Sequence, residues 1–188
     1  MGIEIEKKYR LTADGAGELR ARLAGAGAQA VRGEEFEENT LYAGPNLEPG
    51  RRNLRLRRVN GRAVLTLKER QPSADAVKLQ REEETGVDDA DTLDRVLRAL
   101  GYTPALVYEK RRETWHLDGA EIVIDELPFG WFAEIEGGRD AILRAERRVG
   151  LADADAEQRT YPDLSREHGT LRDGVIEARF GKDTPTSS

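Results

Sequence analysis

Charged and apolar residues alternate at the beginning of the chain. Glu4, Glu6 and Lys8 are separated by single residues, so in a strand they would share one face, with Ile5 and Tyr9 on the other. The apolar face predicts packing against protein. Two carboxylates at this spacing can share a hard divalent cation. One such segment is equally typical of a charged surface strand, and only its repetition decides between the two interpretations.

The same alternation recurs in four later segments of strand-forming sequence. They are residues 54–57, 65–68, 108–112 and 132–136. The solvent face of an ordinary sheet mixes Thr, Ser, Gln and Lys, whereas these faces are almost entirely Arg, Lys and Glu, which must neutralise one another or a ligand. Arrays of Arg and Lys bind phosphate, and carboxylate pairs bind divalent metals. The sequence therefore predicts a site for a metal-complexed polyphosphate.

The order of these motifs resembles that of the CYTH superfamily, also called triphosphate tunnel metalloenzymes. The series is Glu4-x-Glu6-x-Lys8, Arg55-x-Arg57, Lys68, Lys110-x-Arg112, Asp125 and the segment 130–136, Gly-Trp-Phe-Ala-Glu-Ile-Glu. The similarity extends from Ile3 to about Leu164. It implies an α+β fold in which helices flank a closed eight-stranded antiparallel β-barrel, with the active site in the charged interior. Known members include inorganic, thiamine and RNA triphosphatases and class IV adenylate cyclases.

Length and composition are consistent with such a protein. The 188 residues predict one domain over residues 1–181, followed by a disordered tail at 182–188. The 36 acidic and 30 basic side chains give a net charge of −6, which argues against general binding to nucleic acid or membranes and favours a small ligand in a local cationic cavity. The absence of cysteine excludes disulfides, thiolate zinc and cysteine catalysis. A cytoplasmic location is expected.

Turn signals divide the chain into eight expected strands and four helices. The strands are predicted at 3–11, 29–42, 53–59, 62–69, 77–87, 105–117, 120–127 and 130–137. Helices are predicted from Thr12 to Gly25 or Gly27 and at 89–100, 140–149 and 161–168. Asn-Gly at 60–61 and Asp-Gly at 118–119 favour two-residue hairpin turns. The interior of an eight-stranded barrel can just hold side chains or one small ligand.

Candidate site residues fall into two chemical groups. Ligands for one or two Mg²⁺ or Mn²⁺ ions, which prefer carboxylate oxygen, are Glu4, Glu6, Glu83, Asp125, Glu134 and Glu136. The resemblance implies this role for all of them except Glu83. Cations expected to contact triphosphate oxygens are Lys8, Arg55, Arg57, Lys68, Arg81, Lys110 and Arg112. Lys8 and Lys110 are also the candidate catalytic groups, because a lysine or a metal-bound hydroxide could serve as the base.

The sequence does not settle which alternate side chains of the 77–87 strand point inward. Similarity to an Arg-Glu-Glu run of the family favours Arg81 and Glu83 pointing inward, whereas simple alternation would choose Lys78, Glu82 and Glu84. Trp115 and Trp131 fall on the phase opposite the charges, so we expect them to pack outside the barrel. His116 lies on the inward phase near a tunnel mouth, where a surface role is favoured over titration beside substrate.

These observations predict a metal-dependent enzyme that hydrolyses the terminal phosphoanhydride of inorganic tripolyphosphate or a simple organic triphosphate. The only expected partner is that small molecule, and the protein is expected to be a monomer or homodimer. The alternative is a class IV-type adenylate cyclase, which would use the same phosphate grip with the ribose 3′-hydroxyl as nucleophile. A second alternative is a non-catalytic polyphosphate-binding module.

Overall fold

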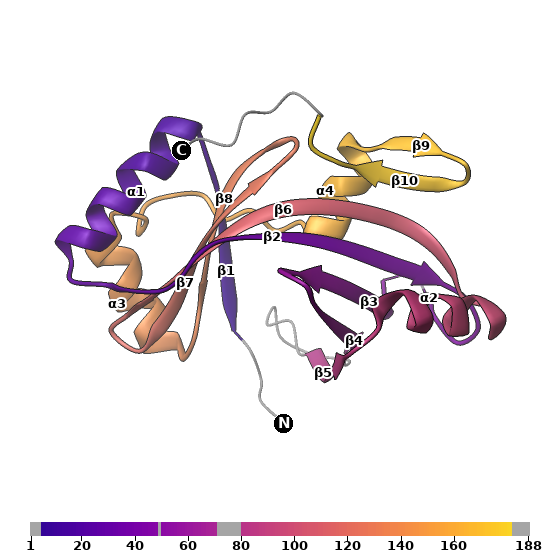
Figure 1. Cartoon of the computed structure of the whole chain (residues 1–188). Helices are drawn as coiled ribbons and strands as arrows, with labels where there is room; N and C mark the ends of the chain where they lie inside the picture. Colours follow the sequence, from indigo (N-terminus) through magenta and orange to yellow (C-terminus); the bar gives the residue numbers. More distant parts are fainter. Residues whose placement is uncertain (1–4, 49, 71–79, 182–188) are drawn as a thin grey trace.

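The structure, a computed structural model, describes residues 5–48, 50–70 and 80–181 (Figure 1). Within these described ranges, four helices and ten strands follow one another. Their bounds are β1 Glu6–Leu11, α1 Ala13–Gly25, β2 Gln29–Ala43, β3 Arg52–Val59, β4 Arg62–Arg70, β5 Gln80–Val87, α2 Ala90–Ala99, β6 Thr103–Leu117, β7 Ala120–Leu127, β8 Gly130–Glu136, α3 Arg139–Val149, α4 Tyr161–His168, β9 Thr170–Arg172 and β10 Val175–Ala178. The expected eight strands and four helices are confirmed. Residues 71–79, which begin the predicted fifth strand, and the predicted disordered tail at 182–188 lie outside the described residues.

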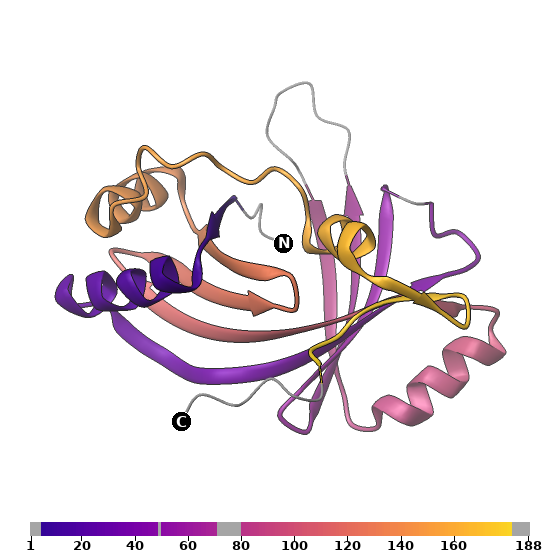
Figure 2. The ribbon, with the colours of Figure 1, turned by 90° about the horizontal axis from the view of Figure 1, so that it is seen from above.

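Eight strands form one continuous antiparallel path in the order β1-β8-β7-β6-β2-β3-β4-β5. The two long strands β2 and β6, of 15 residues each, pair with each other and run through both halves of the sheet. Seen from above, β1, β7 and β8 form one arm, β3, β4 and β5 form the other, and β2 and β6 connect them (Figure 2). The sheet therefore has an inner, concave face between two arms.

The predicted closed barrel is not what the structure describes. Closure would pair β1 with β5, and within the described ranges no ladder joins these strands. The reason lies at the second edge of β1, which is already taken: Tyr9 forms an isolated bridge with Ala156, and the Glu157 amide donates to the Lys8 carbonyl at 2.8 Å. The segment that leads into α4 thus competes for the edge that closure would require.

Two short strands were not predicted. β9 and β10 form a hairpin around Asp173 and Gly174, whose φ angles are 48° and 82°. β10 pairs in parallel with β6 at Leu106–Tyr108, beyond the stretch of β6 that pairs with β7. Strands of three or four residues are too short to show an alternating pattern, and the Asp-Gly pair was their only signal.

Local sequence explains where the other elements begin and turn. Thr12 and Asp89 cap α1 and α2 by accepting hydrogen bonds from backbone amides of the first turn. Asn60 and Asp118 adopt positive φ before the glycines that follow them, as the predicted hairpin turns require. The two hairpins fix the register of β3 against β4 and of β6 against β7, and hence which side chains share the inner face.

The main hydrophobic core lies on the outer face of the sheet, as expected from the alternating pattern. Tyr9, Ile122 and Ile135 pack there against Leu19 and Leu23 of α1 and residues of α3, and Trp115 and Trp131 lie against this core. The predicted position of both tryptophans is confirmed. A second cluster, under α4, lies on the inner face and includes Tyr108, Phe132 and Tyr161.

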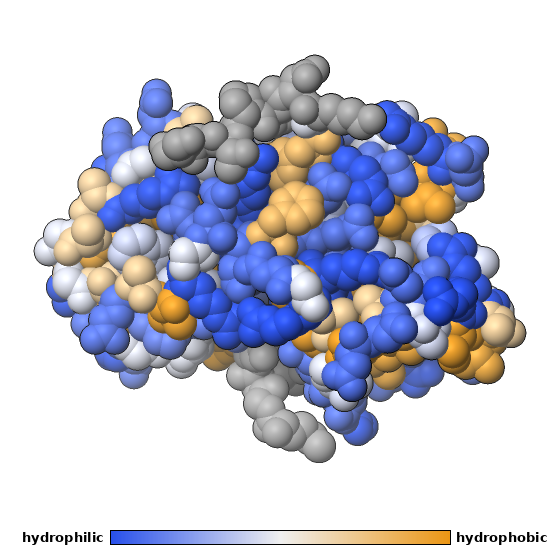
Figure 3. Space-filling view, viewed as in Figure 1, coloured by the Kyte–Doolittle hydropathy of each residue, from blue (hydrophilic) through white to orange (hydrophobic). Residues whose placement is uncertain are grey.

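Hydrophilic residues dominate the surface seen in the direction of Figure 1, with apolar residues in separate patches (Figure 3). Val96 on α2, Leu100 directly after α2 and Leu171 on β9 are among the exposed apolar side chains. In the part of the chain that the structure describes, no helix is long and apolar enough to span a bilayer.

Candidate active site

A network of buried charges occupies the inner face where β1, β8, β7 and β6 lie side by side. The register places Lys8 opposite Glu134 and Asp125 opposite Arg112. Arg112 donates to both carboxylate oxygens of Asp125, at 2.7 and 2.5 Å, and to Glu134 at 2.7 Å. The Lys8 ammonium lies 3.4 Å from Glu134. The structure thus brings together the predicted metal-binding carboxylates and the predicted phosphate-binding cations, whose opposite charges partly neutralise one another.

Asp125 is the most enclosed member of this network. Its side chain is fully buried, and it accepts hydrogen bonds from Arg112 and from the Tyr161 hydroxyl, 2.7 Å away. Burial raises its pKa, but the cations Arg112 and Lys110 and these hydrogen bonds outweigh burial and lower the pKa to about 2. Asp125 therefore stays ionised and holds Arg112 in place.

Lys110 connects this network to the second arm of the sheet. Its ammonium lies 3.6 Å from Asp125 and 3.4 Å from Glu37, and Glu37 is 4.0 Å from Arg57. Burial, together with the neighbouring Arg112 guanidinium, lowers the pKa of Lys110, and the carboxylates of Asp125 and Glu37 only partly offset the shift. A lysine whose pKa is lowered in this way is suited to accept a proton.

The phase preferred for the 77–87 strand is wrong. Register with β4 places Glu82 opposite Lys68 and Glu84 opposite Thr66, and the corresponding contacts are 2.8 Å for the ion pair and 3.0 Å for the hydrogen bond. Glu84 also lies 3.5 Å from Arg57. Simple alternation, the alternative phase, is therefore correct.

Arg81 and Glu83 lie on the opposite face of β5. They pair with each other at 2.7 Å, and more than half of each side chain is exposed. Because a strand reverses its side chains at every residue, neither can point to the inner face in this register. Neither is therefore a candidate for metal or phosphate contact there.

The two edges of the sheet face one another across the concave face. Loss of hydration, reinforced by the Glu134 carboxylate, raises the pKa of Glu6, and Lys8, Lys68 and Arg112 oppose this shift. Lys68 belongs to β4 and Glu6 to β1, so these residues from opposite arms lie close enough to influence each other. Glu136 is opposite Glu6 in the ladder between β1 and β8. Glu4 lies outside the described residues.

Three buried polar atoms near β3 have no hydrogen-bond partner among the described residues. They are Nε of Arg55, Nε of Arg57 and Oδ1 of Asn39. Unsatisfied buried donors cost free energy, and sites where they occur call for an explanation. Two arginines with spare donors, side by side on the inner face, are suited to an anionic ligand.

Sequence reasoning missed Glu37, Asn39 and Tyr161 as inner-face residues, and it named Glu84 only in the alternative phase of the 77–87 strand. The pairing of β2 with β6 shifts register twice between Ala30 and Glu35, so the alternation of β2 does not continue through its first half. Glu35, Glu37 and Asn39 do alternate after these shifts, which was the available signal. Tyr161 comes from a helix, and strand alternation could not have found it.

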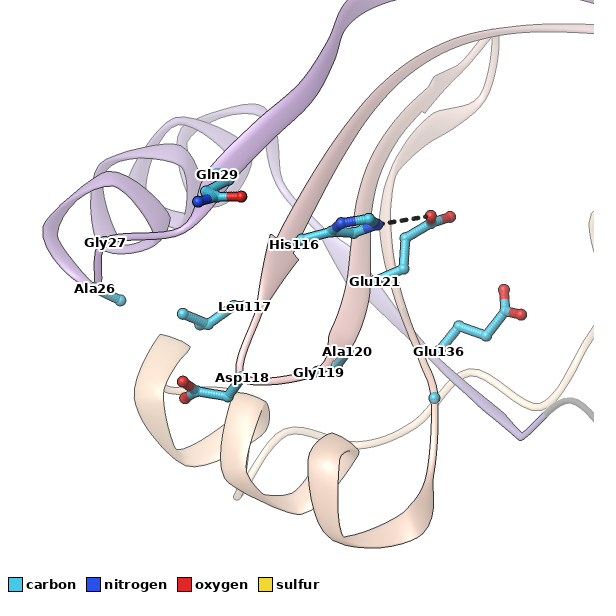
Figure 4. Close-up of a pocket in the computed structure, with 11 residues that line it drawn as sticks. Ala26, Gly27, Gln29, His116, Leu117, Asp118, Gly119, Ala120, Glu121 and Glu136 are labelled. Carbon is cyan, nitrogen blue, oxygen red and sulfur yellow. Dashed lines mark hydrogen bonds and ion pairs between the residues drawn. The ribbon is translucent and has the colours of Figure 1, made fainter.

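His116 lies at the rim of the inner face, where its ring is 3.3 Å from Glu121 and its side chain is 54% exposed (Figure 4). Both residues, with Glu136 and Gln29, line a surface pocket of about 730 Å³ at the end of the β6–β7 hairpin. The inward phase expected for His116 is confirmed. Its exposure agrees with the surface role that the sequence favoured.

The donor chemistry fits a hard divalent cation. The carboxylates of Glu6, Glu134 and Glu136 come from two adjacent strands, and no cysteine is available to favour softer metals. Loss of hydration and, after it, the nearby Glu134 carboxylate raise the pKa of Glu6, and a bound cation would offset both effects. Within the described ranges, no three His, Asp or Glu side chains are already arranged to hold an ion. Asp125, enclosed by cations, is better placed to position Arg112 than to bind metal.

The lowered pKa of Asp125 predicts acid sensitivity. Its ionic contacts stabilise the fold fully above the ordinary carboxyl pKa near 4 and are lost as the pH falls toward about 2, where the folded carboxyl protonates. We expect the free energy of unfolding of the wild type to fall by roughly 2 kcal/mol more between pH 5 and pH 2 than that of Asp125→Asn. Urea unfolding at several pH values measures this. Equal slopes in the two proteins would contradict it.

The chain belongs to the CYTH domain family, whose model matches residues 2–161. An adenylate cyclase, CyaB, of Aeromonas hydrophila is 28% identical over 181 residues, which cover 89% of this chain and 91% of that protein. The PH1012 protein of Pyrococcus horikoshii is 26% identical, with a TM-score of 0.73 over 86% of this chain and 99% of that one. A putative adenylyl cyclase from Hippeastrum, described as having a dominant triphosphatase activity, shares the fold: 16% identity, TM-score 0.67, 91% of this chain and 98% of that one.

Proposed function

We propose that the protein is a metal-assisted hydrolase that cleaves the terminal phosphoanhydride of inorganic tripolyphosphate or a simple organic triphosphate. The observation that carries this proposal is the unpartnered pair of arginine Nε atoms, Arg55 and Arg57, on an inner face that also holds Lys8, Lys68, Lys110 and Arg112. A linear triphosphate offers many anionic oxygens in a row, and cations distributed over both arms match that shape. Bound between the arms, it would bridge them without main-chain closure of the sheet.

Each group of residues would have its own task. Arg55 and Arg57 would bind phosphate oxygens through their free donors, and Arg112, held by Asp125, would neutralise charge that builds up as the anhydride breaks. Lys110, with its lowered pKa, would accept the proton of the attacking water at Nζ. Glu6, Glu134 and Glu136 would hold Mg²⁺ or Mn²⁺, which supplies Lewis acidity and orients the phosphates when bound. A cytoplasmic location and a monomeric or homodimeric state stay predictions.

The test compares products from three substrates. The protein is incubated with tripolyphosphate, thiamine triphosphate and ATP in the presence of Mg²⁺ or Mn²⁺, and orthophosphate, pyrophosphate and cyclic AMP are quantified. Orthophosphate release from tripolyphosphate is the expected result. Binding without turnover of any substrate would contradict the hydrolase and support a polyphosphate-binding module.

An adenylate cyclase is the second candidate, because a relative of that name is 28% identical to this chain over nearly its full length. The same cations would then bind ATP, and the ribose 3′-hydroxyl would attack the α-phosphorus. Cyclic AMP and pyrophosphate as the main products, with little orthophosphate, would favour this candidate over the hydrolase.

Weak discrimination among nucleobases is expected. Tyr108 and Phe132, the aromatic residues assigned to the inward strand phase, are buried in the cluster under α4 and present no free ring face to a base. Values of kcat/KM for ATP, GTP and CTP should therefore agree within roughly tenfold, or about 1.4 kcal/mol. Steady-state kinetics on the three nucleotides measures this, and a preference for ATP of a hundredfold or more would contradict it.

A further inference from the structure

The residues that follow α3 wrap around Lys8 before α4 begins. The Glu157 amide donates to the Lys8 carbonyl at 2.8 Å, and the Lys8 ammonium donates to the Arg159 carbonyl at 3.1 Å. The same ammonium lies 4.1 Å from the centre of the Tyr161 ring, a distance typical of a cation–π contact. A short segment outside the main sheet thus fixes the position of a candidate catalytic lysine.

Tyr161 touches three members of the charged network. Its hydroxyl donates to Oδ2 of Asp125 at 2.7 Å, and the same oxygen accepts from Arg112 at 2.5 Å. Its ring lies beneath Lys8 and 5.4 Å from the Lys110 ammonium. Tyr161 is only 6% exposed and packs edge-on against Phe132.

Local structure fixes where Tyr161 sits. Thr160 and Asp163 form a reciprocal capping box at the start of α4, and Pro162 occupies the first turn. At the other end, Gly169 packs so closely that a Cβ would lie 2.7 Å from Ile176 of β10. After β10, the Arg179 guanidinium donates hydrogen bonds to Glu38 of β2 and Glu109 of β6, at 2.6 and 2.8 Å. Residues beyond the family match at 2–161 therefore hold Tyr161 against the sheet.

We propose that Tyr161 is a positioning residue that keeps Arg112 and Lys8 available for a triphosphate; this inference rests on the proposed function. The hydroxyl takes up part of the Asp125 charge, so Asp125 orients Arg112 without fully neutralising it. Without this hydroxyl, Asp125 would bind Arg112 and Lys110 more tightly, and both cations would be less available to phosphate. The ring acts separately, by holding the Lys8 ammonium in place.

A matched pair of tyrosines makes the test specific. Tyr42, 5% exposed, donates to Asp94 at 2.6 Å on the outer side under α2, so Tyr42→Phe removes a tyrosine–aspartate hydrogen bond of similar length away from the site. Thermal unfolding, calorimetric binding of tripolyphosphate, and KM and kcat are measured for wild type, Tyr161→Phe, Tyr161→Leu and Tyr42→Phe. We expect both Phe variants to lose similar stability.

Only Tyr161→Phe should weaken tripolyphosphate binding and raise KM, by roughly tenfold, as expected for loss of a hydrogen bond to a charged group. Its kcat should fall as well, because Arg112 and Lys110 also act while the anhydride breaks. Tyr161→Leu, which also removes the ring beneath Lys8, should in addition lower kcat by roughly fivefold or more. Equal KM and binding constants in the two Phe variants would overturn this inference alone. A wild-type protein that binds no triphosphate would overturn the proposed function and this inference together.

Discussion

Arg112→Ala should lower kcat/KM for tripolyphosphate by roughly 2–4 kcal/mol, which is about thirtyfold to a thousandfold. Arg112 is fixed by two hydrogen bonds to Asp125 and one to Glu134, so it would meet developing charge without having to reorganise. Preorganised donors of this kind, in a site shielded from water, stabilise a transition state more than exposed ones do. The measurement is orthophosphate release under steady-state conditions.

Arg111→Ala is the matched control. Arg111 is adjacent in β6 but lies on the opposite face, where it pairs with Glu126 at 2.8 Å. Its loss should leave kcat/KM unchanged. Arg112→Ala also leaves the buried Asp125 carboxylate without its main partner, so it should reduce the stability of the fold. Arg112→Lys provides a second test, because it keeps the positive charge but loses the bidentate contact. Wild-type kcat/KM in Arg112→Lys would argue against the proposed grip.

Strand alternation predicted the inner face wherever neighbouring strands pair without irregularity. The register of β1, β8, β7 and β6 keeps Lys8, Glu134, Asp125 and Arg112 on one face, so a period of two in the sequence was sufficient. The same logic placed Trp115 and Trp131 against the outer core. A two-residue turn at Asp118 and Gly119 preserved the pattern between strands.

Residues 81–84 are all charged, and there the similarity to an Arg-Glu-Glu run led to the wrong choice of Arg81 and Glu83. Simple alternation selected Glu82 and Glu84, which pair with Lys68 and Thr66 in the structure. Closure of the sheet could not be read from alternation. It depends on which segment occupies the second edge of β1, and the competing residues at 156–157 carry no strand signal. Tyr161 was missed because a helix delivers it to a site otherwise made of strands.

Removing the carboxylates at the open edge should abolish turnover. In the double variant Glu6→Gln/Glu136→Gln, two opposed carboxylates of the β1–β8 ladder lose their charge while keeping their shape. Because loss of hydration and crowding with Glu134 already raise the pKa of Glu6, neutralising the pair should leave the fold as stable as before or more so. Mg²⁺ and Mn²⁺, which bind through carboxylate oxygens, should then no longer support hydrolysis.

The control is Glu48→Gln/Glu83→Gln, which changes the net charge equally at two exposed residues that pair with Arg51 and Arg81. It should retain wild-type rates at every metal concentration. Chelation of the metal by EDTA should abolish the activity of both the wild type and this control. The decisive measurement is orthophosphate release as Mg²⁺ or Mn²⁺ is titrated. If the Glu6/Glu136 variant reached the wild-type rate at saturating metal, these carboxylates would not be the metal ligands, and Glu134 with the inner-face pair Glu82 and Glu84 would become the residues to test.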